Sequence, residues 1–159
     1  MAKENIKTLE ELKAIVADAK NSGLTVVTTN GVFDVLHIGH TRYLDRAKEH
    51  GDMLVVGVNS DASVRRLKGP ARPLVPCTER MEIIAALESV DYVFPFDEDT
   101  PVAWIGQLKP DVHVKGGDYK DLPERGAVER GGGRVVIVEK TGEKSTTNLI
   151  KKIISVCKG

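Results

Sequence analysis

Hydrophobic and polar positions along this chain fall into two kinds of segment that alternate. Five short runs are mostly apolar without strict alternation, which is typical of strands buried on both faces of a parallel sheet. Between them, apolar residues recur at a spacing of three and four, which places them on one face of a helix. This alternation predicts an α/β fold with a doubly wound parallel sheet. The strand-like runs cover residues 24–29, 53–59, 92–96, 112–115 and 134–138.

The helical segments carry their own start signals. Thr8, followed by Glu11 three residues later, has the form of a capping box, and the apolar spacing after it predicts a helix that ends at Gly23. Thr78 and Thr100 are expected to cap two later helices, the second with a proline in its first position. After the first helix, helices are predicted over residues 41–50, 61–67, 79–88, 101–108, 122–130 and 146–156.

We expect residues 1–159 to form a single domain, with an N-terminal helix over 1–23 and a core over 24–156. With 41% apolar residues, a chain of this length can bury a proper core, and no linker rich in Pro, Gly or Ser divides it. The expected fold is Rossmann-like, a five-stranded parallel sheet in the strand order 3-2-1-4-5.

Composition and charge narrow the class of partner. Lys and Arg together number 23, as do Asp and Glu, so no overall field attracts nucleic acid or a membrane, and small-molecule partners are expected. Cys77 and Cys157 lack the spacing of a zinc site or a disulfide framework, which favours a reducing, cytoplasmic setting. No apolar run approaches the roughly 18 residues of a membrane span, and no signal peptide is expected.

Three polar clusters follow predicted strands. In an open parallel sheet, ligands bind beyond the carboxyl ends of the strands, and in the expected strand order these three ends converge on one crevice. The clusters are NGVFDVLHIGH at 30–40, KGGDY at 115–119 and TGEKSTTN at 141–148.

His37 and His40 stand three residues apart near a predicted helix start, where backbone N–H groups and the helix dipole favour an anion. Two other interpretations stay open. A metal site needs a third ligand, and His50 and His113 fall at the far end of a helix and inside a strand. Alternatively, both rings serve only as caps.

Other groups in these clusters also suit a phosphate. Lys144 and Ser145 resemble the end of a P-loop, but Glu143 and Val138 stand where that motif requires glycine. The hydroxyls of residues 145–147 at a helix start can bind a phosphate or simply cap the helix. Three basic residues flank the irregular stretch 68–76, and each is either a phosphate ligand or a solvated surface charge; they are Lys68, Arg72 and Arg80.

Five segments of the chain together resemble one family. They are NGVFDVLHIGH, VNSDASVRRLKGPARP, ERMEIIAALESVDYVFPFDEDTP, VKGGDY and STTNLIKKI, in the order and spacing of the family over about Leu24 to Ile154. They are similar to the adenylyltransferase half of the bifunctional heptose kinase/adenylyltransferases, within the HxGH nucleotidyltransferase superfamily. Val32 stands where relatives often carry Cys, and the kinase half is absent, so the chain resembles a stand-alone form.

The resemblance implies transfer of AMP from ATP to D-glycero-β-D-manno-heptose 1-phosphate, giving ADP-heptose and pyrophosphate for lipopolysaccharide or related surface glycans. Mg²⁺ is expected to arrive with ATP, with no metal ligand from protein side chains. A homodimer is expected from the habit of the family. Two alternatives remain: another HxGH enzyme, such as a cytidylyltransferase acting on glycerol 3-phosphate, and a non-catalytic nucleotide-binding regulator.

The resemblance also assigns roles to residues. Those expected to stabilise the transition state are His37, His40, Lys68 and Arg80. Those expected to bind the nucleotide are Asn30, Gly31, Val32, Phe33, His37, His40, Lys115, Gly116, Gly117, Ser145, Thr146 and Thr147. Those expected to bind the acceptor are Asp34, Asn59, Asp61 and Lys68, with a purely structural role for Asp34 as the alternative. Arg72 is expected to be an ordinary solvated charge.

Overall fold

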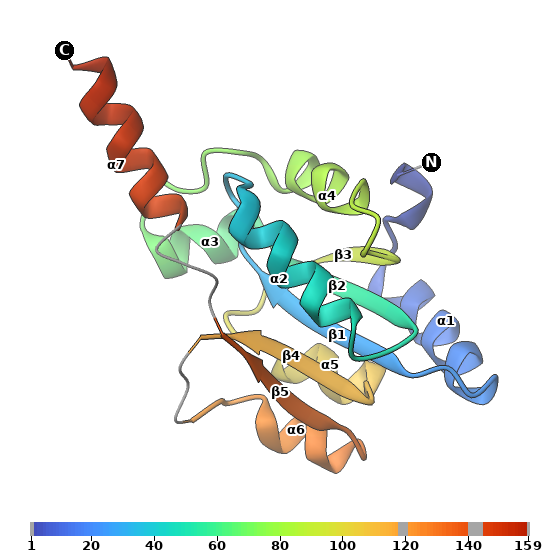
Figure 1. Ribbon diagram of the computed structural model, residues 1–159. Coiled ribbons are helices and arrows are strands. Elements are labelled where there is room, and N and C mark those ends of the chain that lie inside the picture. The colour runs from blue at the N-terminus through green and yellow to red at the C-terminus, as the bar shows by residue number, and fades with distance from the viewer. Residues whose placement is uncertain (1, 118–120, 140–144, 159) are drawn as a thin grey trace.

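The strands form one five-stranded sheet in the order β3-β2-β1-β4-β5, in a computed structural model that describes residues 2–117, 121–139 and 145–158 (Figure 1). Every pairing is parallel, which confirms the predicted sheet and its order. The strands are β1 (Val26–Gly31), β2 (Met53–Asn59), β3 (Tyr92–Phe96), β4 (Val112–Gly116) and β5 (Arg134–Val138).

Helices cover both faces of the sheet, as the doubly wound prediction requires (Figure 1). This explains why the strands are mostly apolar without alternation: six consecutive residues of β2, from Leu54 on, are buried. One face is packed by α2 (Ile38–Lys48) and α4 (Cys77–Ala85), and the other by α1 (Leu9–Asn21), α5 (Val102–Leu108) and α6 (Arg125–Arg130).

Three further helices lie outside these two layers. A short 3-10 helix (Ala2–Asn5), which the pattern did not predict, precedes α1, and α3 (Asp61–Lys68) follows β2. The last helix, α7 (Thr146–Cys157), projects from the body of the molecule (Figure 1). No helix in the described part of the chain is long and apolar enough to cross a membrane.

Helix starts differ most from the sequence-based expectation. The helix predicted to begin at residue 41 begins at Ile38, because the ring of His37 serves as its cap. The cap expected from Thr78 is wrong: α4 begins at Cys77, whose N–H donates at 2.9 Å to the carboxylate of Asp61. The cap expected from Thr100 is also wrong, since Pro101 takes that position without a side-chain bond.

Candidate active site

The carboxyl ends of β1 and β4 open into a cleft with a volume of about 370 Å³, a size typical of small-molecule sites. The starts of α2 and α7 and the loop after α3 complete its walls. All three polar clusters of the sequence contribute to it. The predicted site residues that line the cleft are Asn30, Gly31, Val32, Phe33, Asp34, His37, His40, Lys68, Lys115, Gly116, Ser145, Thr146 and Thr147.

Four predicted site residues are not among the described residues that line the cleft: Asn59, Asp61, Arg80 and Gly117. Asn59 is buried, and its side-chain amide donates to the hydroxyl of Ser63 at 3.0 Å. Asp61 accepts from Arg80 at the far side of the loop. Of the polar cluster at 115–119, residues 118 and 119 lie outside the described residues, as do residues 141–144 of the third cluster.

The two cleft histidines share the first turn of α2. The N–H of Gly39 donates to Nδ1 of His37 at 3.1 Å, and the N–H of His37 donates at a long 3.4 Å to Nδ1 of His40. The rings stack with centroids 4.0 Å apart, and Phe33 contacts His40 edge-on. Both capping contacts therefore use Nδ1.

This hydrogen bonding selects a tautomer. A ring whose Nδ1 accepts an N–H carries its proton on Nε2, so each neutral ring is a donor through Nε2. Burial, together with the neighbouring His37, lowers the pKa of His40 to about 4, so His40 is neutral near pH 7. A neutral N–H donor at a helix N-terminus suits an anionic ligand.

The metal-site alternative finds no support among the described residues, where no group of three His, Cys, Asp or Glu side chains could hold an ion. His113 is fully buried within β4, and its Nδ1 lies 2.8 Å from the hydroxyl of Thr28. It is therefore not available as a third ligand for the histidine pair.

Two polar side chains, Asn30 and Glu124, contact Lys115, the lysine at the end of β4 that lines the cleft. The ammonium of Lys115 donates to the side-chain oxygen of Asn30 at 3.2 Å and lies 3.3 Å from the carboxylate of Glu124. Burial by itself would raise the pKa of Glu124, but contact with His113 and the charge of Lys115 outweigh it and lower that pKa to about 2. An ionised carboxylate beneath the cleft thus holds Lys115 in place.

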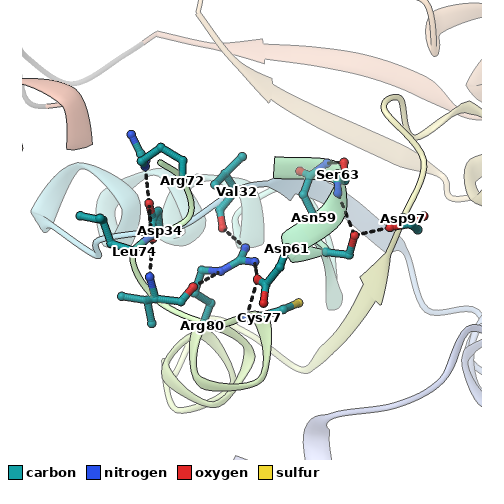
Figure 2. A network of polar contacts seen from close by, with 12 residues as sticks. Val32, Asp34, Asn59, Asp61, Ser63, Arg72, Leu74, Cys77, Arg80 and Asp97 are labelled. Carbon is teal, nitrogen blue, oxygen red and sulfur yellow. Dashed lines mark hydrogen bonds and ion pairs between the residues drawn. The ribbon is translucent and has the colours of Figure 1, made fainter. Parts of the chain in front are cut away.

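Asp34 clamps the loop after α3, as Figure 2 shows. Its carboxylate accepts from the backbone N–H groups of Leu74 and Val75, both at 2.8 Å, and from Nε of Arg72 at 2.5 Å. Burial would raise the pKa of Asp34, but these three donors outweigh it and the pKa is lowered. The expectation that Arg72 is a solvated charge is wrong, because its side chain is only 17% exposed and lines the cleft.

Arg80 fixes the same loop from behind (Figure 2). Its guanidinium is fully buried and donates to the carbonyls of Val75 at 2.9 Å and Val32 at 2.5 Å, and to Asp61 at 2.7 Å. The Arg80 side chain thus joins its own helix, α4, to the residues after β1, the start of α3 and the loop before α4. Arg80, expected to bind phosphate directly, is in this structure a residue that positions the loop carrying Arg72.

The start of α7 closes another side of the cleft. The hydroxyl of Ser145 caps the helix by accepting from the N–H of Asn148 at 3.1 Å, and the hydroxyl of Thr146 donates to the carbonyl of Val35 at 3.3 Å. The hydroxyl of Ser145 thus caps the helix, and the hydroxyl of Thr146 links α7 to the loop after β1. Both residues, with Thr147, line the cleft.

Four residues that line the cleft were not assigned from the sequence: Gly39, Tyr43, Arg72 and Glu139. Tyr43 follows His40 by three residues on α2, and this helical spacing is a signal that places both on one face. Its hydroxyl donates to the carbonyl of Val114 at 3.0 Å, and a Cβ on Gly116 would lie 3.1 Å from its ring. Close packing of Tyr43 is thus the reason for a glycine at 116.

Comparisons with known proteins agree with this geometry. The bifunctional protein HldE of Geotalea uraniireducens is 56% identical over 152 residues, and HldE of Salmonella arizonae is 52% identical over 150 residues. Each match covers 93% of this chain, but the chain spans only 31% of the length of these relatives.

A solved structure is also similar. The lipopolysaccharide core biosynthesis protein of Thermoplasma volcanium superposes with a TM-score of 0.62 at 32% identity, covering 77% of this chain and all of that one. The sequence profile of the cytidylyltransferase-like family matches residues 28–155, which include most of β1, the histidine pair and the start of α7. The chain therefore belongs to the cytidylyltransferase-like family of nucleotidyltransferases.

Proposed function

We propose that this chain transfers AMP from ATP to D-glycero-β-D-manno-heptose 1-phosphate, releasing pyrophosphate and forming ADP-heptose. The observation that carries the proposal is the cleft itself. It joins the histidine pair, the hydroxyl-rich start of α7 and the cations Lys68, Arg72 and Lys115 around one space. The motif resemblance to heptose adenylyltransferases and the likeness to a lipopolysaccharide core biosynthesis protein support the choice of acceptor.

The reaction requires no enzyme nucleophile. An oxygen of the heptose phosphate attacks the α-phosphorus of ATP, the bond from that phosphorus to the bridging oxygen breaks, and pyrophosphate leaves with the electron pair. A phosphate monoester, with a second pKa near ~6, is already largely dianionic at neutral pH and needs little help from a base. The protein must align two anions and neutralise the charge that develops on them.

Each part of the cleft has a role in this proposal. His37 and His40 donate Nε2–H to the triphosphate in the transition state, and Lys68, at the end of α3, adds a mobile positive charge. Residues 145–147 hold the outer phosphates. The nucleoside lies along residues 30–33 and against residues 115–117. Asp34, Asp61 and Arg80 act from behind by fixing the loop that faces the acceptor, and Asn59 acts by holding α3 through Ser63.

Mg²⁺ enters this proposal with ATP. Of the two carboxylates among the described residues that line the cleft, Asp34 already accepts three donors, and the other is Glu139. This set fits a hydrated ion bound mainly to phosphate oxygens, as Mg²⁺ prefers. When bound, it would neutralise charge on the phosphates. ATP as substrate also supports a cytoplasmic location.

A homodimer is the further part of the proposal. No residue of α7 is buried, and its apolar residues Ile153 and Val156 are 51% and 70% exposed. Apolar surface of this kind marks protein contacts. Light scattering should give twice the chain mass for the wild type and the chain mass for Ile153→Glu; a monomeric wild type would contradict this part.

The test of the activity is release of pyrophosphate across a small grid of substrates. The β anomer of heptose 1-phosphate with ATP should turn over much faster than the α anomer with ATP or the β anomer with CTP. Preferred turnover of glycerol 3-phosphate with CTP would favour the cytidylyltransferase alternative. Binding of ATP without pyrophosphate release from any phosphate ester would favour the non-catalytic regulator.

A further inference from the structure

Arg72 is the cleft cation to which the sequence motifs assign no site role. It lies in the loop between α3 and α4, lines the cleft, and keeps 17% of its side chain exposed. Its guanidinium contacts the described residues through Nε, which donates to the carboxylate of Asp34 at 2.5 Å. Neither terminal nitrogen of the guanidinium has a partner in the described parts of the chain.

The anchor of this arginine is rigid. Asp34 is 2% exposed, and its oxygens also accept the N–H groups of Leu74 and Val75, two and three residues beyond Arg72 (Figure 2). Behind the loop, Arg80 holds the carbonyl of Val75 at 2.9 Å. The backbone on the C-terminal side of Arg72 and the Nε edge of its guanidinium are therefore both fixed before any ligand arrives, which lowers the entropy lost on binding.

The way Asp34 holds Arg72 leaves its best binding edge unused. Arginine and carboxylate groups frequently pair through two parallel N–H bonds, whereas here the carboxylate takes Nε alone. The opposite edge, with Nη1 and Nη2, presents the planar fork that matches two oxygens of a phosphoryl group. Lys68, four residues earlier, lines the same cleft and supplies a second positive charge.

We propose that Arg72, oriented by Asp34, binds a phosphoryl group of the substrates through its terminal nitrogens. The inference rests on the proposed function for the identity of the ligands, but its chemistry is that of any phosphate ester. The group held is either a phosphate of the nucleotide, retained in the pyrophosphate product, or the phosphate of the acceptor sugar.

The test is calorimetric binding of MgATP, pyrophosphate and β-heptose 1-phosphate to Arg72→Lys, with Arg66→Lys as matched control. Arg66 lies on α3, pairs with Asp99 at 2.9 Å and is outside the described cleft lining. Lysine keeps the charge beside Asp34 but lacks the fork, so Arg72→Lys should weaken binding of a phosphate ligand by about tenfold or more. Arg66→Lys should stay within about twofold of wild type.

The pattern of loss identifies the group. Weaker binding of both MgATP and pyrophosphate assigns Arg72 to the nucleotide phosphates, and weaker binding of heptose 1-phosphate alone assigns it to the acceptor. Wild-type affinity for all three ligands overturns the inference. Because calorimetry reports affinity per folded molecule, a partly unfolded sample lowers the stoichiometry and leaves the affinity readable.

Failure of the proposed function gives a different result. In one outcome, the wild type releases no pyrophosphate with any heptose 1-phosphate while Arg72→Lys still binds MgATP about tenfold more weakly. In that case the proposed acceptor would be wrong, and the proposed role of Arg72 in phosphate binding would be upheld. If the wild type turned over the β anomer and Arg72→Lys bound all three ligands normally, the enzyme assignment would stand and the inference about Arg72 would fall.

Discussion

The first turn of α2 and the clamp behind the loop after α3 are both dense in polar groups, yet they use them in opposite ways. At the start of α2, both histidines accept backbone N–H groups through Nδ1 and line the cleft. In the clamp, the guanidinium of Arg80 is fully buried and donates to three protein oxygens.

Exposure to the cleft separates residues that can act on a ligand from residues that position them. A residue of the first kind lines the cleft, whereas a positioning residue is buried and its polar groups are bound by other protein groups. By this criterion Arg72 belongs with the histidines and Lys68, and Arg80 is a positioning residue. Substitutions in the two regions should therefore fail in different ways.

The largest effect is expected from Arg80→Met. Methionine is apolar and of similar length, but it leaves two carbonyls without their donor and leaves Asp61 with only the N–H of Cys77. The loss of these bonds around a fully buried side chain is expected to cost roughly 3 kcal/mol of the free energy of unfolding, although the carboxylate of Asp61 is itself 34% exposed. Urea unfolding measures it, and a loss below about 1 kcal/mol would show that the clamp does not hold the loop.

His37→Asn and His40→Asn should lower kcat by about 100-fold or more, the loss typical of removing a transition-state donor. Asparagine is a good N-cap at position 37, and at position 40 it keeps a polar side chain in the first turn, so the melting temperature should change little. Steady-state pyrophosphate release at saturating substrates is the measurement. If both variants turn over normally, the rings are caps and nothing else.

Lys68→Ala should lower kcat/KM by about tenfold or more while the free energy of unfolding stays within about 0.5 kcal/mol, because an exposed charge adds little stability. Lys68→Arg should recover only part of the activity, since a planar fork does not replace a compact point charge. A loss of activity that merely followed a lowered melting temperature would move Lys68 into the positioning group.

The smallest effect is on the pH dependence of stability. The folded pKa of His40, about 4, lies below the usual value near ~6.5, so between these values the unfolded chain takes up a proton that the folded chain does not. Stability should therefore fall as pH drops from about 6.5 to about 4, and His40→Asn should flatten this slope in urea unfolding at a series of pH values. An equal slope in both proteins would contradict the neutral state of His40.

Much of this architecture follows from local pattern. Strands buried on both faces leave unmistakable apolar runs, and right-handed crossovers between them restrict the order of a parallel sheet. The polar clusters at strand ends converge because the carboxyl ends of parallel strands share one edge. Thirteen of the seventeen site residues named from the sequence therefore line it.

The features that the sequence does not reveal are contacts between residues that lie far apart in the chain. Arg72 and Arg80 look alike in the chain, but the first pairs with Asp34, 38 residues away, and the second with Asp61, 19 residues away. The same holds for the start of α4, which is capped by Asp61 rather than by Thr78. Periodicity carries no information about such contacts. Tyr43, by contrast, was detectable from its spacing to His40.

The most direct test of the comparison is kcat per folded molecule plotted against melting temperature for His37→Asn, His40→Asn and Arg80→Met. The account predicts that the histidine variants lose kcat by about 100-fold at an unchanged melting temperature. Arg80→Met should lose melting temperature first, with the folded molecules keeping far more of their kcat. Histidine variants whose kcat fell only in step with their melting temperature would contradict the account.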